Sequence, residues 1–325
     1  MNRFIRIILS VLFIGFLIPT NAFAAFGLIS QKLTPPTPGP NQEVTIQLNS
    51  YNVNLNAAKI IWYIDGEAQK EGTAETSFVT RTGDFGEKKV VDVVIFAQDG
   101  TRFDKQIVLA PAEVDILWEA LTYTPPFYKG KALPTYKSLV KVSALARFNT
   151  ETSDPAAYYY KWTLDRNKGV GEALGKNSTV VAAAWPDSHV NVAVETSLPG
   201  TDWKGAKNLN IDSVNPQVVF YEQAPLLGIR FAQALTSGLV ATGNEFTIQA
   251  APYFFSLDNY KNGELVYEWT ANRNRVLPTL DPLKLILTKS SKAAENFIVS
   301  LSVQNAKRVI QEGRGQTTVS FNAEE

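Results

Sequence analysis

The residue types that most often carry out catalysis are scarce in this chain of 325 residues. Cysteine is absent and histidine occurs once, as His189. The missing thiols remove disulfides, thiolate metal sites and cysteine nucleophiles. A zinc site or a serine-histidine-aspartate triad needs several groups that converge, and only Asp187 lies near His189 in the sequence. We therefore interpret His189 as a surface residue at the start of a strand, and we predict no catalytic residue and no metal site.

Two further kinds of chemistry lack a starting point. Asp84-Phe85-Gly86 spells the magnesium-binding tripeptide of protein kinases, but the Gly-rich loop, strand lysine and catalytic loop that give it meaning are missing, so we interpret it as a turn. No Gly-x-Ser-x-Gly motif or phosphate-cradling loop occurs. The acidic residues are scattered, and they single out neither a glycosidase carboxylate pair nor a calcium loop. The sequence predicts a non-enzymatic protein without a cofactor.

Aromatic residues in expected loops are the remaining candidates for binding. Exposed rings on a β-sandwich can stack on sugars or anchor a protein partner. Alternatively, such rings fill the ends of the sandwiches or the junctions between modules. We favour this second interpretation and keep the first as the candidate ligand or partner surface. The residues concerned are Tyr123, Phe127, Tyr128, Trp185 and Trp203.

Three tryptophan-centred segments organise the chain. Trp162 lies in Tyr158–Asn167, Trp269 lies in the similar segment Leu265–Asn274, and Trp62 lies in a looser copy. Each segment is typical of a β-strand that runs into a polar turn. Successive tryptophans are about 100 residues apart, the length of one β-sandwich domain, and such a period predicts tandem modules. We expect Trp62, Trp162 and Trp269 to lie in the cores of three modules.

The pattern between the tryptophans favours an all-β fold. Val44, Ile46 and Leu48 alternate with polar residues, which is the period of a half-buried strand. Six or seven short strands per ~100 residues, with turn residues between them, predict antiparallel sandwiches. The expected organisation is a signal peptide at 1–24, a proline-rich lead-in at 25–42, and modules at 43–112, 113–213 and 214–325.

The first tryptophan strand and its surroundings resemble bacterial immunoglobulin-like (Ig-like) and PKD-like modules. Ile61-Trp62-Tyr63-Ile64-Asp65-Gly66 is followed by Gly72 and by the apolar strand Val90–Gln98. Equivalent elements follow Trp162 (Val190–Thr196) and Trp269 (Phe297–Asn305). The Trp-x-Phe-Gly-Asp-Gly core of the PKD pattern is absent from all three copies. The resemblance implies three tandem Ig-like or PKD-like sandwiches of the kind that serve exported proteins as spacers, adhesive arms or scaffold parts.

The N-terminus has the pattern of an export signal. Arg3 and Arg6 precede an apolar run from Ile7 to Ile18, and Ala22-Phe23-Ala24 fits a cleavage site, so we expect cleavage after Ala24. The alternative is an uncleaved anchor, but the run is shorter than the ~20 residues that span a bilayer. We expect a periplasmic, cell-surface or extracellular protein with no membrane span after cleavage. The 31 basic and 31 acidic residues argue against a nucleic-acid partner.

These observations favour a non-enzymatic structural, adhesive or scaffold protein of the cell envelope, whose partner is a protein or a glycan. Two alternatives remain open. One is a secreted protein that binds or cleaves carbohydrate, and the other is a subunit of an envelope assembly such as a pilus or a secretion machine.

Overall fold

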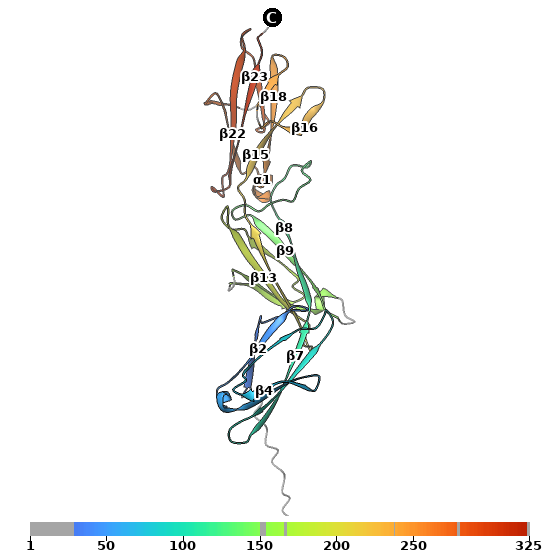
Figure 1. Ribbon diagram of the computed structural model, residues 1–325. Helices are drawn as coiled ribbons and strands as arrows, with labels where there is room; N and C mark the ends of the chain where they lie inside the picture. The colour runs from blue at the N-terminus through green and yellow to red at the C-terminus, as the bar shows by residue number, and fades with distance from the viewer. Residues whose placement is uncertain (1–28, 150–153, 166–167, 237, 278–279, 324–325) are drawn as a thin grey trace, which may run out of the picture.

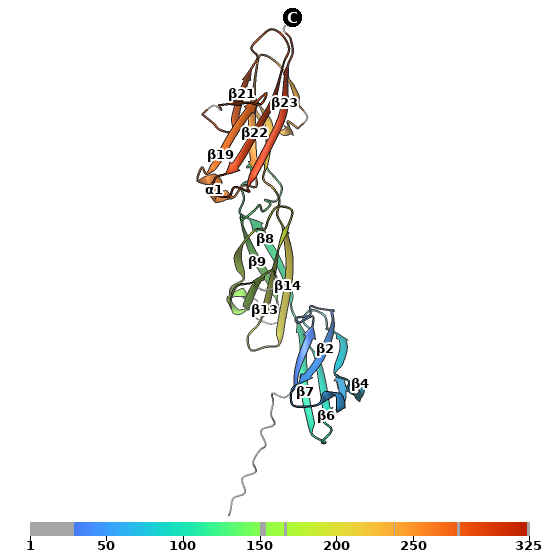
Figure 2. The same ribbon diagram turned by 90° about the vertical axis from the view of Figure 1, so that its left-hand side faces the viewer.

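Three β-sandwich modules follow one another in an elongated array (Figures 1 and 2). The computed structural model describes residues 29–149, 154–165, 168–236, 238–277 and 280–323. The expected signal peptide and its cleavage site at Ala24 lie outside these residues. Helical structure among them is confined to α1 (Leu257–Lys261) and the 3-10 turns η1 (Leu55–Ala57) and η2 (Pro155–Ala157). No helix in the described ranges has the length and apolar character needed to cross a membrane.

Module 1 has one sheet in the order β1-β2-β5 and a second in the order β4-β3-β6-β7. Strand β1 pairs antiparallel with β2, from Ile29–Ser50 to Thr34–Thr45. Residues 29–34 therefore belong to the first sandwich, which corrects the expectation that all of 25–42 is an extended lead-in. The strands are β1 (Ile29–Thr34), β2 (Glu43–Ser50), β3 (Lys59–Ile64), β4 (Glu67–Thr73), β5 (Ser77–Arg81), β6 (Lys89–Phe96) and β7 (Arg102–Pro111).

Module 2 repeats this topology, with the sheet orders β8-β9-β12 and β11-β10-β13-β14. Its last strand, β14, pairs in parallel with the end of β7, at Trp203–Ala110 and Lys204–Pro111. This pairing joins the second sheets of modules 1 and 2 into one sheet of eight strands. The strands are β8 (Glu113–Ala120), β9 (Leu139–Arg147), β10 (Tyr159–Leu164), β11 (Lys168–Leu174), β12 (Ser178–Ala182), β13 (His189–Ser197) and β14 (Trp203–Asp212).

Module 3 adds two strands to the same plan. Strand β16 forms a hairpin with β15, and β17 pairs in parallel with β23, so that the sheet orders are β16-β15-β18-β21 and β17-β23-β22-β19-β20. The strands are β15 (Gln217–Ala224), β16 (Gly228–Ala234), β17 (Leu239–Ala241), β18 (Glu245–Tyr253), β19 (Leu265–Ala271), β20 (Asn274–Val276), β21 (Lys284–Thr288), β22 (Glu295–Asn305) and β23 (Glu312–Phe321).

Each module is built around one buried tryptophan on its third core strand, β3, β10 or β19. Trp62, Trp162 and Trp269 are 0%, 0% and 1% exposed. In each case the indole Nε1 donates a 2.8 Å hydrogen bond to a backbone carbonyl 13 or 14 residues further along the chain. A buried indole N–H needs such a partner. The acceptors are the carbonyls of Glu75, Lys176 and Pro282. The same contact therefore ties the third strand to the loop that leads into the opposite sheet in all three modules.

One buried hydroxyl in module 2 leads to a stability prediction. Tyr160 is fully buried, and its hydroxyl has no hydrogen-bond partner among the described residues. Burial raises its pKa to about 12, because the phenolate would lose its hydration, and the nearby Tyr158 and Asp154 add to the effect. The phenol ionises at a lower pH in the unfolded chain than in the folded one. Its contribution to the free energy of unfolding is therefore complete below pH 10 and is lost as the pH rises toward 12.

Replacing Tyr160 by phenylalanine is expected to leave module 2 as stable at pH 8, or more stable by up to ~1 kcal/mol, because no described hydrogen bond is lost. The variant should also lose less stability than the wild type between pH 10 and 12. Urea denaturation followed by circular dichroism at both pH values checks this. If the variant's free energy of unfolding at pH 8 is lower than that of the wild type by more than ~1 kcal/mol, the Tyr160 hydroxyl has a hydrogen-bond partner after all.

Candidate interaction sites at the module joints

The described residues hold no group of three or more histidine, aspartate or glutamate side chains placed to bind a metal ion. His189 is exposed at the first residue of β13, and Asp84-Phe85-Gly86 forms an exposed turn between β5 and β6. The features that depart most from three plain sandwiches lie where the modules meet. These two joints are therefore the candidate interaction sites.

The first joint has almost no linker, because Ala112 alone separates β7 from β8. The Ala112 N–H donates to the Lys204 carbonyl at 2.9 Å, next to the parallel pairing of β7 with β14. Gly205 makes this close approach possible, since a Cβ there would lie 2.5 Å from Val114 Cγ2. Trp203 is 5% exposed and packs into the module 2 core. Backbone hydrogen bonds therefore hold modules 1 and 2 together.

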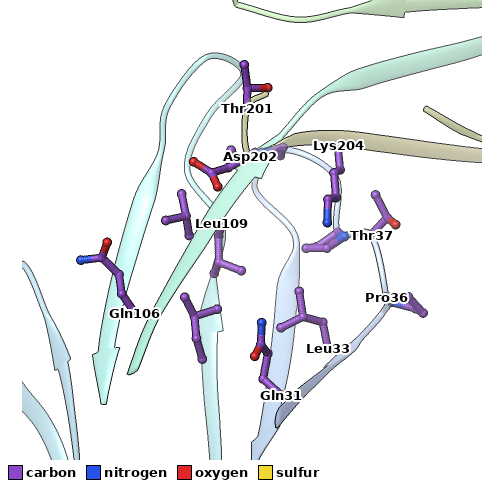
Figure 3. Close-up of a pocket in the computed structure, with 14 residues that line it drawn as sticks. Gln31, Leu33, Pro36, Thr37, Gln106, Leu109, Thr201, Asp202 and Lys204 are labelled. Carbon is purple, nitrogen blue, oxygen red and sulfur yellow. The ribbon is translucent and has the colours of Figure 1, made fainter. Parts of the chain in front are cut away.

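A groove of about 270 Å³ lies beside this joint, between β1 and β7 (Figure 3). Gln31 and Leu33 come from β1, and Gln106 and Leu109 come from β7. Module 2 contributes Thr201, Asp202 and Lys204. Asp202 and Lys204 bring one charge of each sign. The groove therefore offers amide, hydroxyl and charged groups of both signs for polar contacts.

The second joint is formed by the segment between β8 and β9, residues 121–138, which reaches module 3. Thr122 forms a β-bridge with Ser256. The Tyr123 N–H donates to the Phe255 carbonyl, and the Phe254 N–H donates to the Tyr123 carbonyl, both at 2.7 Å. The Val214 N–H, in the short connection between β14 and β15, donates to the carbonyl of Pro134 at 2.9 Å. Backbone hydrogen bonds therefore connect modules 2 and 3 as well.

A buried side-chain network locks the second joint. Gln311 is fully buried, and its Nε2 donates to the Tyr136 carbonyl of module 2 at 2.6 Å and to Ser256 Oγ at 2.7 Å. Its Oε1 accepts from Asn305 Nδ2 at 2.8 Å and from the Ser256 N–H at 3.2 Å. One amide therefore connects both modules. Buried polar groups with every partner in place tend to fix a single arrangement.

Stacked aromatic rings cover the outer side of the second joint. Tyr123 stacks on Tyr260 with ring centroids 3.6 Å apart, and Phe127 stacks on Phe231 at 3.6 Å. The pKa of Tyr123 is raised well above its usual value, first by burial and then by its hydrogen bond to Tyr260. The stacked pairs therefore give this surface a largely apolar, aromatic character.

The five aromatic residues that the sequence singled out all lie near joints, but in different environments. Tyr123, Phe127 and Tyr128 are half-buried in the second joint, and Trp203 is buried in the first. Trp185 is 58% exposed, and its ring lies 4.5 Å from that of Tyr136 near the second joint. Trp203 is therefore closed to a ligand, whereas more than half of the Trp185 side chain is open to solvent.

Sequence reasoning missed the residues that complete the second joint. Phe231, Tyr221 and Tyr253 pack on the rings of Phe127 and Tyr128. They belong to strands of module 3, where alternation alone shows which residues share a face but not what covers that face. Gln311 contacts a carbonyl 175 residues away, and no local pattern signals such a pair.

No protein-family model and no curated protein sequence matches the chain. Solved structures do match at low similarity. The three N-terminal domains of the Highly Immunogenic Outer Capsid protein (Hoc) of bacteriophage RB49 are 11% identical with a TM-score of 0.26, over 92% of this chain and 99% of that one. The central fibronectin-III array of RIM-binding protein is 10% identical with a TM-score of 0.30, over 91% and 96%.

A third match is to the fibronectin(III)-like modules of CbhA from Clostridium thermocellum. These modules are 11% identical with a TM-score of 0.26, and the alignment covers 57% of this chain and 94% of that one. The sheet orders described above define the class of the protein. It is an all-β chain of three tandem Ig-like β-sandwich modules.

Proposed function

We propose that the chain is an exported, non-enzymatic protein of the cell envelope that acts as a stiff spacer or scaffold and holds partners at its two ends. The observation that carries this proposal is that backbone hydrogen bonds cross both joints. Joints of this kind restrict the hinge motion expected of modules on flexible linkers. The Arg3–Ala24 export pattern supports a place outside the cytoplasmic membrane.

One observation favours carbohydrate binding as a second candidate function. Trp185 presents an exposed ring, with the Tyr136 ring 4.5 Å away and tilted by 41°. Two neighbouring aromatic faces offer a platform on which a sugar ring can stack. Its exposed position at the flank of the second joint would let a glycan reach it without any change in the joint.

Cell fractionation and cross-linking of the tagged chain test the proposed function. We expect the protein in the envelope or external fraction, with a mature N-terminus at Ala25, and a cross-linked envelope partner that does not depend on Trp185. Retention of the protein in the cytoplasm would contradict the proposal. Glycan-array binding that Trp185→Ala abolishes would favour the second candidate instead. Hydrolysis of an envelope polysaccharide that depends on one carboxylate pair would contradict both the scaffold function and simple carbohydrate binding.

A further inference from the structure

The hairpin of β15 and β16 ends in an apolar tip. Pro225, Leu226 and Leu227 connect the strands, and Gly228, with φ of +72°, completes the turn. Leu226 is 97% exposed and Leu227 is 80% exposed. The β3–β4 turn of module 1, by contrast, consists of Asp65 and Gly66. Two adjacent leucines in full contact with water form a surface of the kind that a partner covers.

An apolar socket lies on the same flank of module 3, between the hairpin and residues 123–127 of module 2. Its volume is about 260 Å³, and its lining includes no charged side chain. Gln249, a polar residue of the lining, turns its Nε2 toward the carbonyls of Ala250 and Leu283. The remaining side chains that matter here are Tyr123, Phe127, Ile229, Phe231 and Pro252.

The second joint holds the walls of this socket in place. Phe127 stacks on Phe231 at 3.6 Å and meets Tyr221 edge-on at 5.4 Å, while Tyr123 is fixed by its stack on Tyr260. The hollow is thus formed before anything enters it, which lowers the entropic cost of binding. Without a charge or a free polar side chain in its lining, it suits a branched aliphatic side chain.

The tip and the socket lie on one surface, because Ile229 lines the socket only two residues after Leu227. The hairpin projects from the flank of module 3 (Figure 1). A surface that carries both a projection and its complement can pair with a copy of itself about a two-fold axis. Charge does not oppose this approach, since Glu222 and Arg230 at the hairpin neutralise each other at 2.9 Å.

We infer that two copies of this chain associate through this flank, with Leu226 and Leu227 of each copy seated in the socket of the other. The inference is independent of the proposed function. A tip of two side chains per copy makes a contact much smaller than the ~800 Å² per partner of a standard interface. We therefore expect weak association, which is strengthened where copies are held close together.

Sedimentation equilibrium of the purified protein from about 10 µM to 1 mM tests the inference. The wild type should show a monomer–dimer equilibrium. A tip variant, Leu226→Lys with Leu227→Lys, should weaken dimerisation at least tenfold, because it would place ammonium groups in an apolar socket. The matched control is Tyr51→Lys, which changes a fully exposed aromatic residue of module 1 and should leave the Kd unchanged. A wild type that stays monomeric up to 1 mM would overturn the inference.

A mixing experiment separates the paired arrangement from a general loss of solubility or fold. The socket variant Phe231→Lys alters a residue that is 39% exposed, and circular dichroism checks that both variants are folded. In a mixture of tip and socket variants, the socket variant's intact tip meets the tip variant's intact socket. The mixture should associate more strongly than either variant alone. Equal association in all three samples would contradict the reciprocal insertion.

Discussion

Replacing Trp269 by alanine is expected to destabilise module 3 by about 3–5 kcal/mol, the largest effect of any single change considered for this chain. The ring is 1% exposed and stacks on Phe220 with centroids 5.4 Å apart. Its removal leaves a cavity between the two sheets and deprives the Pro282 carbonyl of its 2.8 Å hydrogen bond. Since a domain is stable by only ~5–15 kcal/mol, much of the module would lose its native fold near body temperature.

Denaturation with urea, followed by circular dichroism, measures this effect. Trp269→Phe should cost less, because it keeps most of the apolar volume and loses mainly the indole N–H. Trp185→Ala is the matched control, as that ring is 58% exposed, and a change at such a surface position should stay within ~0.5 kcal/mol. A Trp269→Ala protein that unfolds at the wild-type urea concentration would show that the core is not organised around the indole.

Replacing Gln311 by alanine is expected to cost about 3 kcal/mol and to loosen the second joint. The change leaves the Tyr136 carbonyl, the Ser256 N–H and the Asn305 amide without the partners that they have in the buried network. Each buried polar group left unsatisfied costs ~1–3 kcal/mol, less what water recovers by entering the space. The free energy of unfolding should fall, and the distribution of distances between modules 2 and 3 should become broader.

Gln98→Ala is the control for this second prediction, because Gln98 is an exposed glutamine in a turn of module 1 and should affect neither quantity. Two outcomes would separate the roles of Gln311. If stability falls but the distance distribution is unchanged, Gln311 stabilises module 3 without fixing the joint. Unchanged stability would mean that the network is not needed at all.

The sequence carried enough information to predict the modules but not the joints. Alternation at Val44, Ile46 and Leu48 and the three tryptophans predicted buried strands, because burial on one face imposes a period of two residues. The prolines of residues 35–40 suggested a lead-in, although the six residues before them complete the first sheet. Proline limits the residues around it but leaves a preceding strand free to pair at a sheet edge.

The candidate site was predicted only in part, for a physical reason. Tyr123, Phe127 and Tyr128 stood out as aromatic residues in an expected loop, and they do lie in the second joint. What they contact depends on strands of module 3 that are distant in the sequence. Phe231 and Gln311 acquire their roles only once the two modules are placed end to end.

The central claim is that hydrogen bonds across both joints make the three modules one stiff array. Because the chain has no cysteine, two spin labels can be attached without interference, at Tyr51→Cys in module 1 and Val266→Cys in module 3, both exposed positions. Pulsed electron-electron double resonance then measures the distance between them. We predict a single narrow distance distribution in dilute solution. A broad distribution or several separated distances would contradict the account.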